Sequence, residues 1–304
     1  MSNVLVPLSI LEISPSRQDG ISELEEILHR ALGCELIQES GILLRFPQVV
    51  MVTAQNVFHR FYYRKSLLKY DVFTVAMGCT ILAAKLEEKQ KLLREVLFVY
   101  HHIYQKRKQL KYKPLDIGSR RYTLWKNELI FMESYILKEL GFSLYSVTAE
   151  HPHKYILYYV KMLQGSEELS QKAWNYLNDS MRRDLALRYK PQVIACAAIY
   201  MAARVLQHPL PSNFDWLEVM DTDIKTIHSV CNQILELYHM PKLQWLEPLA
   251  ETTHLSPEAC AEYDEPRDET SIEQAPEISA VRANGSNADC IDNKDANESS
   301  GNKD

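Results

Sequence analysis

Side chains that could bind a metal ion or act as nucleophiles are scattered along this sequence. The six cysteines include no C-x-x-C pair. His151 and His153, in the run H-P-H-K, have no further His or Cys ligand at metal-binding spacing. His101 and His102 are adjacent, so on a helix they point to different faces. We therefore expect no metal site and no cofactor, and we interpret H-P-H-K as a structured linker.

Motifs of the common enzyme classes are missing. The sequence has no glycine-rich phosphate loop, no nucleophile elbow and no alternation of strands with helices. Lys or Glu interrupts every apolar run before it reaches the roughly 20 residues that span a bilayer, and no signal peptide opens the chain. A soluble protein of a reducing compartment, without catalysis of the α/β type, is therefore expected.

A basic stretch is the densest run of positive charge in the chain. It could serve nuclear import or contact an acidic partner such as RNA, or it could be a solvated loop between two helices. Its members are Lys106, Arg107, Lys108, Lys111, Lys113, Arg120 and Arg121.

One helical sequence occurs twice, 119 positions apart, and indicates which elements hold these side chains. Residues 75–86 read V-A-M-G-C-T-I-L-A-A-K-L, and residues 194–205 read I-A-C-A-A-I-Y-M-A-A-R-V. Both copies are apolar nearly all round and rich in small residues, which is typical of a helix surrounded by other helices. The repeat therefore predicts two all-helical domains, each built around one buried central helix.

Helical periodicity and capping residues predict five helices in each domain. In the first domain we expect helices over 22–32, from Pro47 to about 62, from a cap at Asp71 to about 88, and over 92–107 and 120–140. In the second we expect 153–163, 167–182, a central helix opened by Pro191, a short helix around Trp216, and 223–238.

The C-terminal segment has a different composition. Residues 251–304 hold 14 Asp or Glu against 4 Lys or Arg and few large apolar side chains, so we expect a disordered acidic tail. The chain carries −6 overall, which leaves about +4 on the first 250 residues, too little for a dedicated nucleic-acid binder. The expected divisions are an N-terminal extension (1–20), two helical domains (21–145 and 146–247) and the tail (248–304).

Two tandem five-helix bundles, the first with a central helix ending A-A-K-L-E-E, resemble the cyclin fold. The runs that carry a closer resemblance, to the cyclin L branch of the transcriptional cyclins, cover much of residues 14–246. They are L-G-C-E-L-I-Q-E-S-G-I-L-L-R-F-P-Q (32–48), R-F-Y-Y-R-K-S (60–66), L-K-E-L-G-F (137–142), H-P-H-K (151–154) and W-N-Y-L-N-D-S-M-R (174–182).

The resemblance implies a non-catalytic, nuclear subunit that binds and activates a cyclin-dependent kinase in transcription and pre-mRNA processing. It assigns the kinase contact to Lys85 and Glu133, with Glu87 and Glu88 as weaker candidates. Lys85 ends a helix too apolar for a lone ammonium, and its donors suit the free carbonyls of a partner helix. The second copy keeps Arg204 opposite Lys85 but aligns Cys231 or Asn232 with Glu133. Each residue also has an alternative interpretation without a kinase. Lys85 could interact only with the last carbonyls of its own helix, and Glu133 could lie on an ordinary solvated helix face.

Three departures from the family change what is expected. His59 stands where cell-cycle cyclins often have an acidic residue, so we expect a change in their usual buried charge cluster. Glu23, Glu25 and Glu26 on the first helix replace an apolar docking patch for substrate peptides. The tail has no Arg-Ser repeats, so contacts with splicing machinery are less expected than the kinase.

A second hypothesis is a general transcription factor of the TFIIB type, which holds DNA between similar boxes. The sequence lacks the zinc ribbon and the strong positive charge of that class, so direct nucleic-acid binding is not expected.

Overall fold

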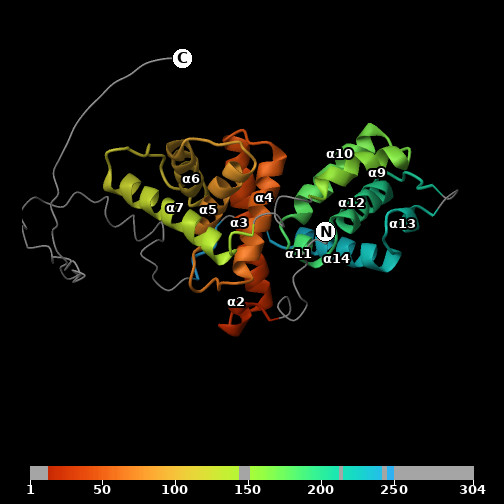
Figure 1. Cartoon of the computed structure of the whole chain (residues 1–304), viewed down its shortest axis with the longest axis horizontal. Coiled ribbons are helices and arrows are strands. Elements are labelled where there is room, and N and C mark those ends of the chain that lie inside the picture. Colours follow the sequence, from red (N-terminus) through yellow and green to blue (C-terminus); the bar gives the residue numbers. More distant parts are fainter. Residues whose placement is uncertain (1–12, 144–150, 212–214, 242–244, 250–304) are drawn as a thin grey trace, which may run out of the picture. The chain divides into compact units, whose positions relative to one another are not determined.

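The computed structural model describes residues 13–143, 151–211, 215–241 and 245–249. All regular structure within these ranges is helical, in two bundles (Figure 1). After a short α2 (Pro15–Gln18), the first bundle holds α3 (Glu23–Leu43), α4 (Gln48–Tyr62), α5 (Val72–Leu86), α6 (Leu93–Arg107) and α7 (Arg120–Glu139). The second holds α9 (His153–Met162), α10 (Glu167–Ser180), α11 (Leu185–Arg188), α12 (Pro191–Val205), α13 (Trp216–Val219) and α14 (Ile224–His239). The all-α prediction is confirmed.

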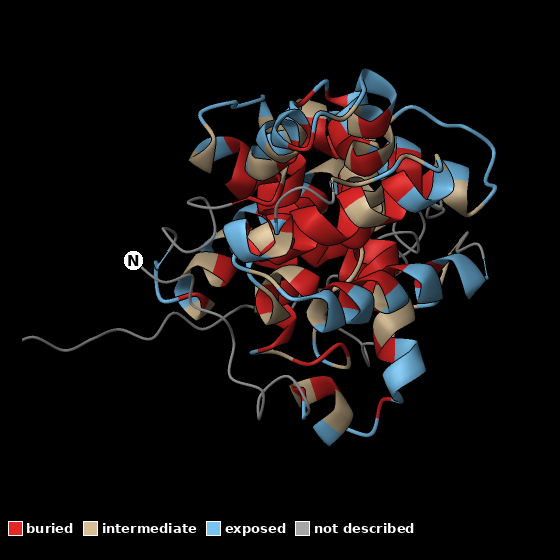
Figure 2. Cartoon of the chain, turned by 90° about the vertical axis from the view of Figure 1, so that its right-hand side faces the viewer, coloured by how far each residue is buried: buried red, intermediate tan, exposed pale blue. Residues whose placement is uncertain are grey.

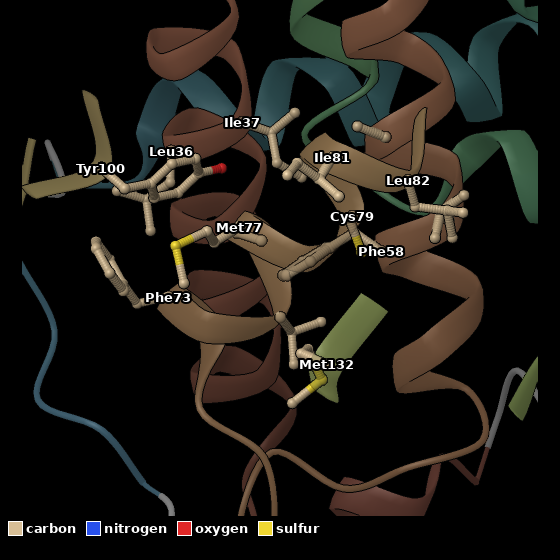
Figure 3. Packing of buried hydrophobic residues seen from close by; sticks show 14 of the residues in the cluster. Leu36, Ile37, Phe58, Phe73, Met77, Cys79, Ile81, Leu82, Tyr100 and Met132 are labelled. Carbon is tan, nitrogen blue, oxygen red and sulfur yellow. The ribbon is translucent and has the colours of Figure 1, made fainter. Parts of the chain in front are cut away.

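Helix α5 is the centre of the first bundle because its neighbours pack against it from several sides. Asp71 caps its first turn by accepting a hydrogen bond from the Thr74 amide at 3.1 Å, as the sequence predicted. Every residue from Val72 to Ala84 is buried. Figure 3 shows side chains of α3, α4, α6 and α7, including Leu36, Phe58, Tyr100 and Met132, around Met77 and Cys79 of α5.

The small residues of the repeated sequence allow helices to approach closely. A Cβ atom added at Gly78 would lie 2.9 Å from Cγ of Met132, so α7 could not keep its distance from α5 with a larger residue there. Ala197 is the corresponding residue in the second bundle. Its carbonyl oxygen lies 3.6 Å from the Cys231 sulfur of α14. The two central helices therefore hold their partner helices at the same point of the repeat.

Helix α3 is longer than its sequence pattern suggested. It begins with the expected cap, a capping box between Ser22 and Glu25, but continues past residue 32 to Leu43. The two glycines in its interior, Gly33 and Gly41, do not end the helix; they lie against Phe58 and Met51 of α4, where a Cβ atom would not fit. The chain leaves the helix only at Arg45, which has a left-handed φ of 56°.

The second bundle has its own hydrophobic core around α12, separate from the core of the first bundle. Buried residues gather in the interior of the bundles, between the helices, and exposed residues lie on the outer helix faces (Figure 2). The five expected helices are present, and the short α11 is an addition that the periodicity did not reveal. Apart from Pro248 and Leu249, the predicted tail (248–304) lies outside the described residues.

Buried charged and aromatic side chains join the two bundles. Arg30 of α3 donates two hydrogen bonds to Glu26, at 2.9 and 2.7 Å, and its guanidinium lies 4.4 Å from the centre of the Tyr63 ring. The Tyr63 hydroxyl donates to Asp184 of the second bundle, which also accepts from Arg188 at 2.8 Å. Burial opposes ionisation of Asp184, but Arg188 and then Arg30 hold its pKa well below the usual range.

The neutral His59 fits beside this cluster without contributing charge. Burial lowers its pKa to about 4, and its Nε2 lies 3.1 Å from the Met181 carbonyl oxygen and 3.2 Å from the Cys34 sulfur. A buried charge cluster is therefore present, built on Glu26 and Asp184. Glu26, one of the three glutamates that the sequence shows in place of an apolar docking patch, is only 3% exposed and belongs to this cluster.

Candidate functional site

The exposed end of α5 brings Lys85 and Glu133 together. Lys85 lies in the last turn, the first position of this helix after the buried run that ends at Ala84. Its Nζ lies 2.6 Å from Oε1 and 2.8 Å from Oε2 of Glu133 on α7. The Lys85 side chain is 52% exposed and that of Glu133 only 12%. Ion pairs at the surface contribute about 0–1 kcal/mol to stability, and the exposed Lys85 ammonium places this pair near that range.

The pair keeps unused hydrogen-bonding capacity. A lysine ammonium has three donors and an ionised carboxylate about four acceptor positions. Even with both carboxylate oxygens facing Lys85, the ammonium has a donor left for a carbonyl of another chain and Glu133 has lone pairs for backbone amides. The sequence predicted both side chains as partner-binding residues, and the structure brings the two together in an ion pair.

Apolar side chains lie on either side of Glu133 along α7. Ile130, three positions before it and on the same helix face, is 44% exposed. Leu137, four positions after it, is partly buried against the core of the first bundle. Phe131, 53% exposed, stacks on Tyr135 with ring centres 5.8 Å apart. The site is therefore an ion pair with an apolar margin of side chains on α7.

Glu87 is turned away from this surface and into the protein. Its Oε1 accepts a hydrogen bond from the Thr53 hydroxyl at 2.6 Å, and Nε2 of His151 lies 3.0 Å from the same hydroxyl. Because burial, and to a lesser extent Lys154, lowers the pKa of His151 to about 4, its ring is neutral. The Nε2 proton can then be donated to Thr53 while Nδ1 faces the Asn56 amide at 3.5 Å. Glu87 therefore ties the end of α5 to α4 and to the start of the second bundle.

Glu88 serves the backbone at the end of α5. It has a left-handed φ of 54°, and the next amide, of Lys89, donates to the Ala84 carbonyl at 2.8 Å. This is a Schellman ending, in which glycine is the residue most often found at the left-handed position. Its side chain is exposed, so it stays a weaker candidate for partner binding.

The second bundle does not repeat the ion pair. Arg204 occupies the position of Lys85, and the shared contact at Ala197 and Gly78 aligns Asn232 with Glu133. Within the described residues, Arg204 has no ion-pair partner. The asymmetry predicted from the repeat is therefore present in the folded chain.

Much of the basic stretch is already paired. Lys106 and Arg107 bind Glu39 of α3 at 2.8 and 2.9 Å, and Lys108 lies 3.7 Å from Glu247. The first two line a cleft of about 550 Å³ whose other charged residues include carboxylates of α3. Lys111 and Lys113 lie in the exposed segment between α6 and α7, and Arg120 and Arg121 begin α7. The stretch is thus only partly available to an anionic partner.

The histidines and cysteines have structural partners. His153 lies 2.8 Å from the Asn178 side-chain oxygen, and the four described cysteines are buried free thiols. In the described ranges no three potential ligands gather in a way that would hold a metal ion. None of the helices described is both long and apolar enough to span a bilayer.

One buried carboxyl on α7 was missed from the sequence. Glu128 is 6% exposed and accepts a hydrogen bond from the Thr74 hydroxyl at 2.8 Å. Burial raises its pKa to about 8. Its position one helical turn after Trp125 and four residues before Met132, both buried, was the signal that places it on the inner face of α7.

Comparison with known families decides what this arrangement belongs to. A family model described as the cyclin N-terminal domain matches residues 11–145, and one described as the cyclin-T2-like C-terminal domain matches residues 151–237. The chain belongs to the cyclin family. The first bundle is thus its first cyclin box.

Relatives of this cyclin include cyclin L proteins of plants and animals. It is 46% identical to cyclin-L1-1 of Arabidopsis thaliana, over 78% of this chain and 56% of that protein. It is 45% identical to cyclin-L1 of Homo sapiens, over 78% of this chain and 45% of that protein. Cyclin-L2 of Mus musculus is 41% identical, over 85% of this chain and 48% of that protein. The chain spans about half the length of the curated relatives it matches.

Solved structures share the cyclin fold at low sequence identity. A chain of the yeast RNA Pol II CTD kinase CTDK-1 complex matches with a TM-score of 0.64 and 18% identity, over 78% of this chain and 73% of that one. A chain of the Chaetomium thermophilum CAK complex bound to ATP-gamma-S matches with a TM-score of 0.53 and 17% identity. This match covers 75% of this chain and 70% of that one. At these identities the matches establish the fold.

Proposed function

We propose that this cyclin is the regulatory, non-catalytic subunit of a cyclin-dependent kinase, and that the Lys85–Glu133 site is its kinase contact. The observation that carries the proposal is the ion pair at the open end of a buried helix, with hydrogen-bonding capacity left over and an apolar margin. The cyclin L names of its relatives and the kinase complexes among the matching structures support the same class of partner.

The site can act by fixing one helix of the partner. Lys85 would bind carbonyls left free at a helix end, and Glu133 would bind backbone amides of the same segment. A kinase becomes active when a mobile helix is placed so that its glutamate pairs with the catalytic lysine. A cyclin that binds this helix in its active position stabilises that position over the others. The active arrangement of the kinase then becomes the most populated one.

The relatives suggest where such a kinase would act. We propose a nuclear complex that phosphorylates components of transcription and pre-mRNA processing, and the RNA polymerase II kinase complex among the matching structures supports the transcriptional role. Contacts with splicing or transcription machinery belong to this proposal.

Charge reversal tests the kinase contact. In the double variant Lys85→Glu with Glu133→Lys the internal ion pair is kept with its signs exchanged, so we expect the chain to fold as before. The variant presents a carboxylate to carbonyls and an ammonium to amides, so we expect affinity purification to recover at least about tenfold less kinase, the loss that follows from like charges or dipoles meeting at an interface.

Arg204→Glu is the matched control, because it changes the equivalent residue of the second bundle. We expect it to recover as much kinase as the unchanged chain. Undiminished kinase recovery with the double variant would contradict the proposal, as would equal losses with Arg204→Glu.

A further inference from the structure

The described residues after α14, 245–249, lead the chain to the basic stretch. Apolar side chains of this segment pack against the core of the first bundle. The Lys108 ammonium, at the end of α6, lies 5.2 Å from the Trp245 ring centre and 3.7 Å from a carboxylate oxygen of Glu247. Because Leu249 follows only two positions later, the sequence after it is attached to the fold beside the basic stretch.

Part of the basic stretch is exposed and unpaired. Residues 106–121 hold seven Lys or Arg and one acidic residue, Asp116. Lys111 and Lys113 lie in the exposed segment between α6 and α7, and neither has an ion-pair partner among the described residues. This segment therefore presents positive charge that the described part of the fold does not neutralise.

Hydrogen bonds hold the exposed segment against α6. The Gln105 side chain donates to the Lys113 carbonyl oxygen at 3.0 Å and accepts from the Lys113 amide at 3.2 Å. Gln105 is only 5% exposed and precedes Lys108 by three positions, which makes the two neighbours at the end of the helix. Lys113 is thus fixed beside the turn that carries Lys108, and one partner segment can contact both lysines.

The sequence that follows Leu249 has the complementary composition. Residues 251–265, the first part of the acidic tail, lie outside the described residues, and we call them the acidic segment. They include Leu255 and Tyr263, while the basic surface exposes 64% of Tyr112. The acidic segment has no Lys or Arg, and its carboxylates are those of Glu251, Glu258, Glu262, Asp264 and Glu265.

We propose that the acidic segment binds the exposed part of the basic stretch, around Lys111 and Lys113, and neutralises it within the same chain. Opposite charges and exposed apolar side chains on both sides favour this pairing. A segment joined to the fold by a short linker reaches an effective concentration on the order of 1 mM, so it has an advantage over any free anion. An external polyanion would have to displace it.

The acidic segment can reach this surface from its point of attachment. Its 15 residues span up to about 50 Å when extended. The surface lies before the first residue of α7, about 20 Å along that helix from Glu133 by its rise per residue, so the inference does not rest on the kinase contact.

A dye attached to Cys260, inside the acidic segment, tests this inference on the full chain. The four described cysteines are buried, so a maleimide dye added to the folded Cys290→Ser chain labels Cys260. The measurement is the fluorescence anisotropy of the dye, compared with that of a free peptide of residues 251–265 with the same dye. We expect Lys111→Glu with Lys113→Glu to remove at least about a third of the excess over the free peptide.

Salt and a matched charge change serve as controls. At 1 M salt, where the Debye length is about 3 Å, the unchanged chain should lose as much anisotropy as the double variant loses. Lys161→Glu with Lys225→Glu makes the same change of charge at exposed lysines of the second bundle and should leave the anisotropy as it is. Circular dichroism and thermal melting show whether each variant is folded.

A double-mutant cycle shows whether the two sides contact each other. Glu258→Gln with Glu262→Gln should lower the anisotropy of the unchanged chain but add little to the loss in the Lys111→Glu and Lys113→Glu chain, because the contact is already broken there. The proposal is overturned by an anisotropy of the unchanged chain equal to that of the free peptide, by no loss in the double variant, by an equal loss in the second-bundle control, or by additive losses in the cycle.

Discussion

Glu133 and Glu128 lie five residues apart on α7, in opposite environments. Glu133 faces Lys85 at the surface, whereas Glu128 lies against the first turn of α5, where burial raises its pKa to about 8. The Glu133 carboxylate pairs with the exposed Lys85 ammonium. The Glu128 carboxyl is mostly protonated at neutral pH and takes part in packing.

The Glu128 environment predicts a pH-dependent stability. The folded chain keeps the Glu128 proton up to about pH 8, whereas a carboxyl with its ordinary pKa of 4.5 loses it much earlier. The folded state therefore binds more protons between these values, and this group lowers stability as the pH rises through that range. Gln resembles the neutral form, so we expect Glu128→Gln to raise Tm at about pH 9 and change it little at about pH 5. The same change at both pH values, measured by thermal melting, would contradict this assignment.

Single residues could be predicted where their role is local or repeated. Lys85 and Glu133 followed from the repeat, its asymmetry and the family resemblance. Glu87 was also selected, but its hydrogen bond to Thr53 depends on how α4 packs, which no local pattern encodes. The burial of Glu26 could not be predicted for the same reason, since its partner Arg30 is held by backbone carbonyls of α4.

At the scale of elements, the crossing of α3 and α4 depends on two glycines of α3, Gly33 against Phe58 and Gly41 against Met51. A Cβ atom at Gly33 would lie 2.0 Å from the Phe58 ring, which is fully buried. We expect Gly33→Ala to lower stability by about 1–3 kcal/mol, the usual cost of overpacking a core, even though alanine favours helix more than glycine does.

Gly118→Ala is the matched control for Gly33→Ala. The nearest atom to a Cβ at Gly118 is an Asp116 oxygen at 3.5 Å, an ordinary contact, so its midpoint in urea should hardly change. An unchanged midpoint for Gly33→Ala would mean that α3 and α4 can move apart freely.

The helices themselves were largely predictable, because capping residues and apolar periodicity are local signals. The later end of α3 was not, since its second half is buried by contacts with other helices and not by a pattern of its own. The return of residues 245–249 to the first bundle was also hidden, because nothing in a five-residue segment shows which distant surface it covers.

At the scale of the whole molecule, three buried histidines make stability depend on pH in the opposite sense to Glu128. Burial lowers the pKa of His59, His151 and His153 to about 4 in each case. In the unfolded chain they return to about 6.5, so the unfolded state binds more protons between these values. Stability from these groups is complete above about pH 6.5 and is lost as the pH falls toward 4.

His59 and His151 both contact residues of the other bundle, through Met181 and Thr53. We therefore expect acidification from about pH 7.5 to 5 to lower Tm, and His59→Gln to lower Tm at neutral pH but to flatten its fall with acid. An equally steep fall in the His59→Gln variant, followed by thermal melting over this range, would contradict the role given to this histidine. The presence of two bundles was predictable from the repeat, whereas these contacts between them were not, because they join residues more than 90 positions apart.

The central claim is that this cyclin activates a kinase through the Lys85–Glu133 site. The most direct measurement is the activity of the kinase that copurifies with the chain, assayed alone, with the unchanged chain and with the Lys85→Glu and Glu133→Lys double variant, using a peptide substrate. We expect the unchanged chain to raise the activity and the double variant to leave it at the level of the kinase alone. Equal activation by the two chains would contradict the claim.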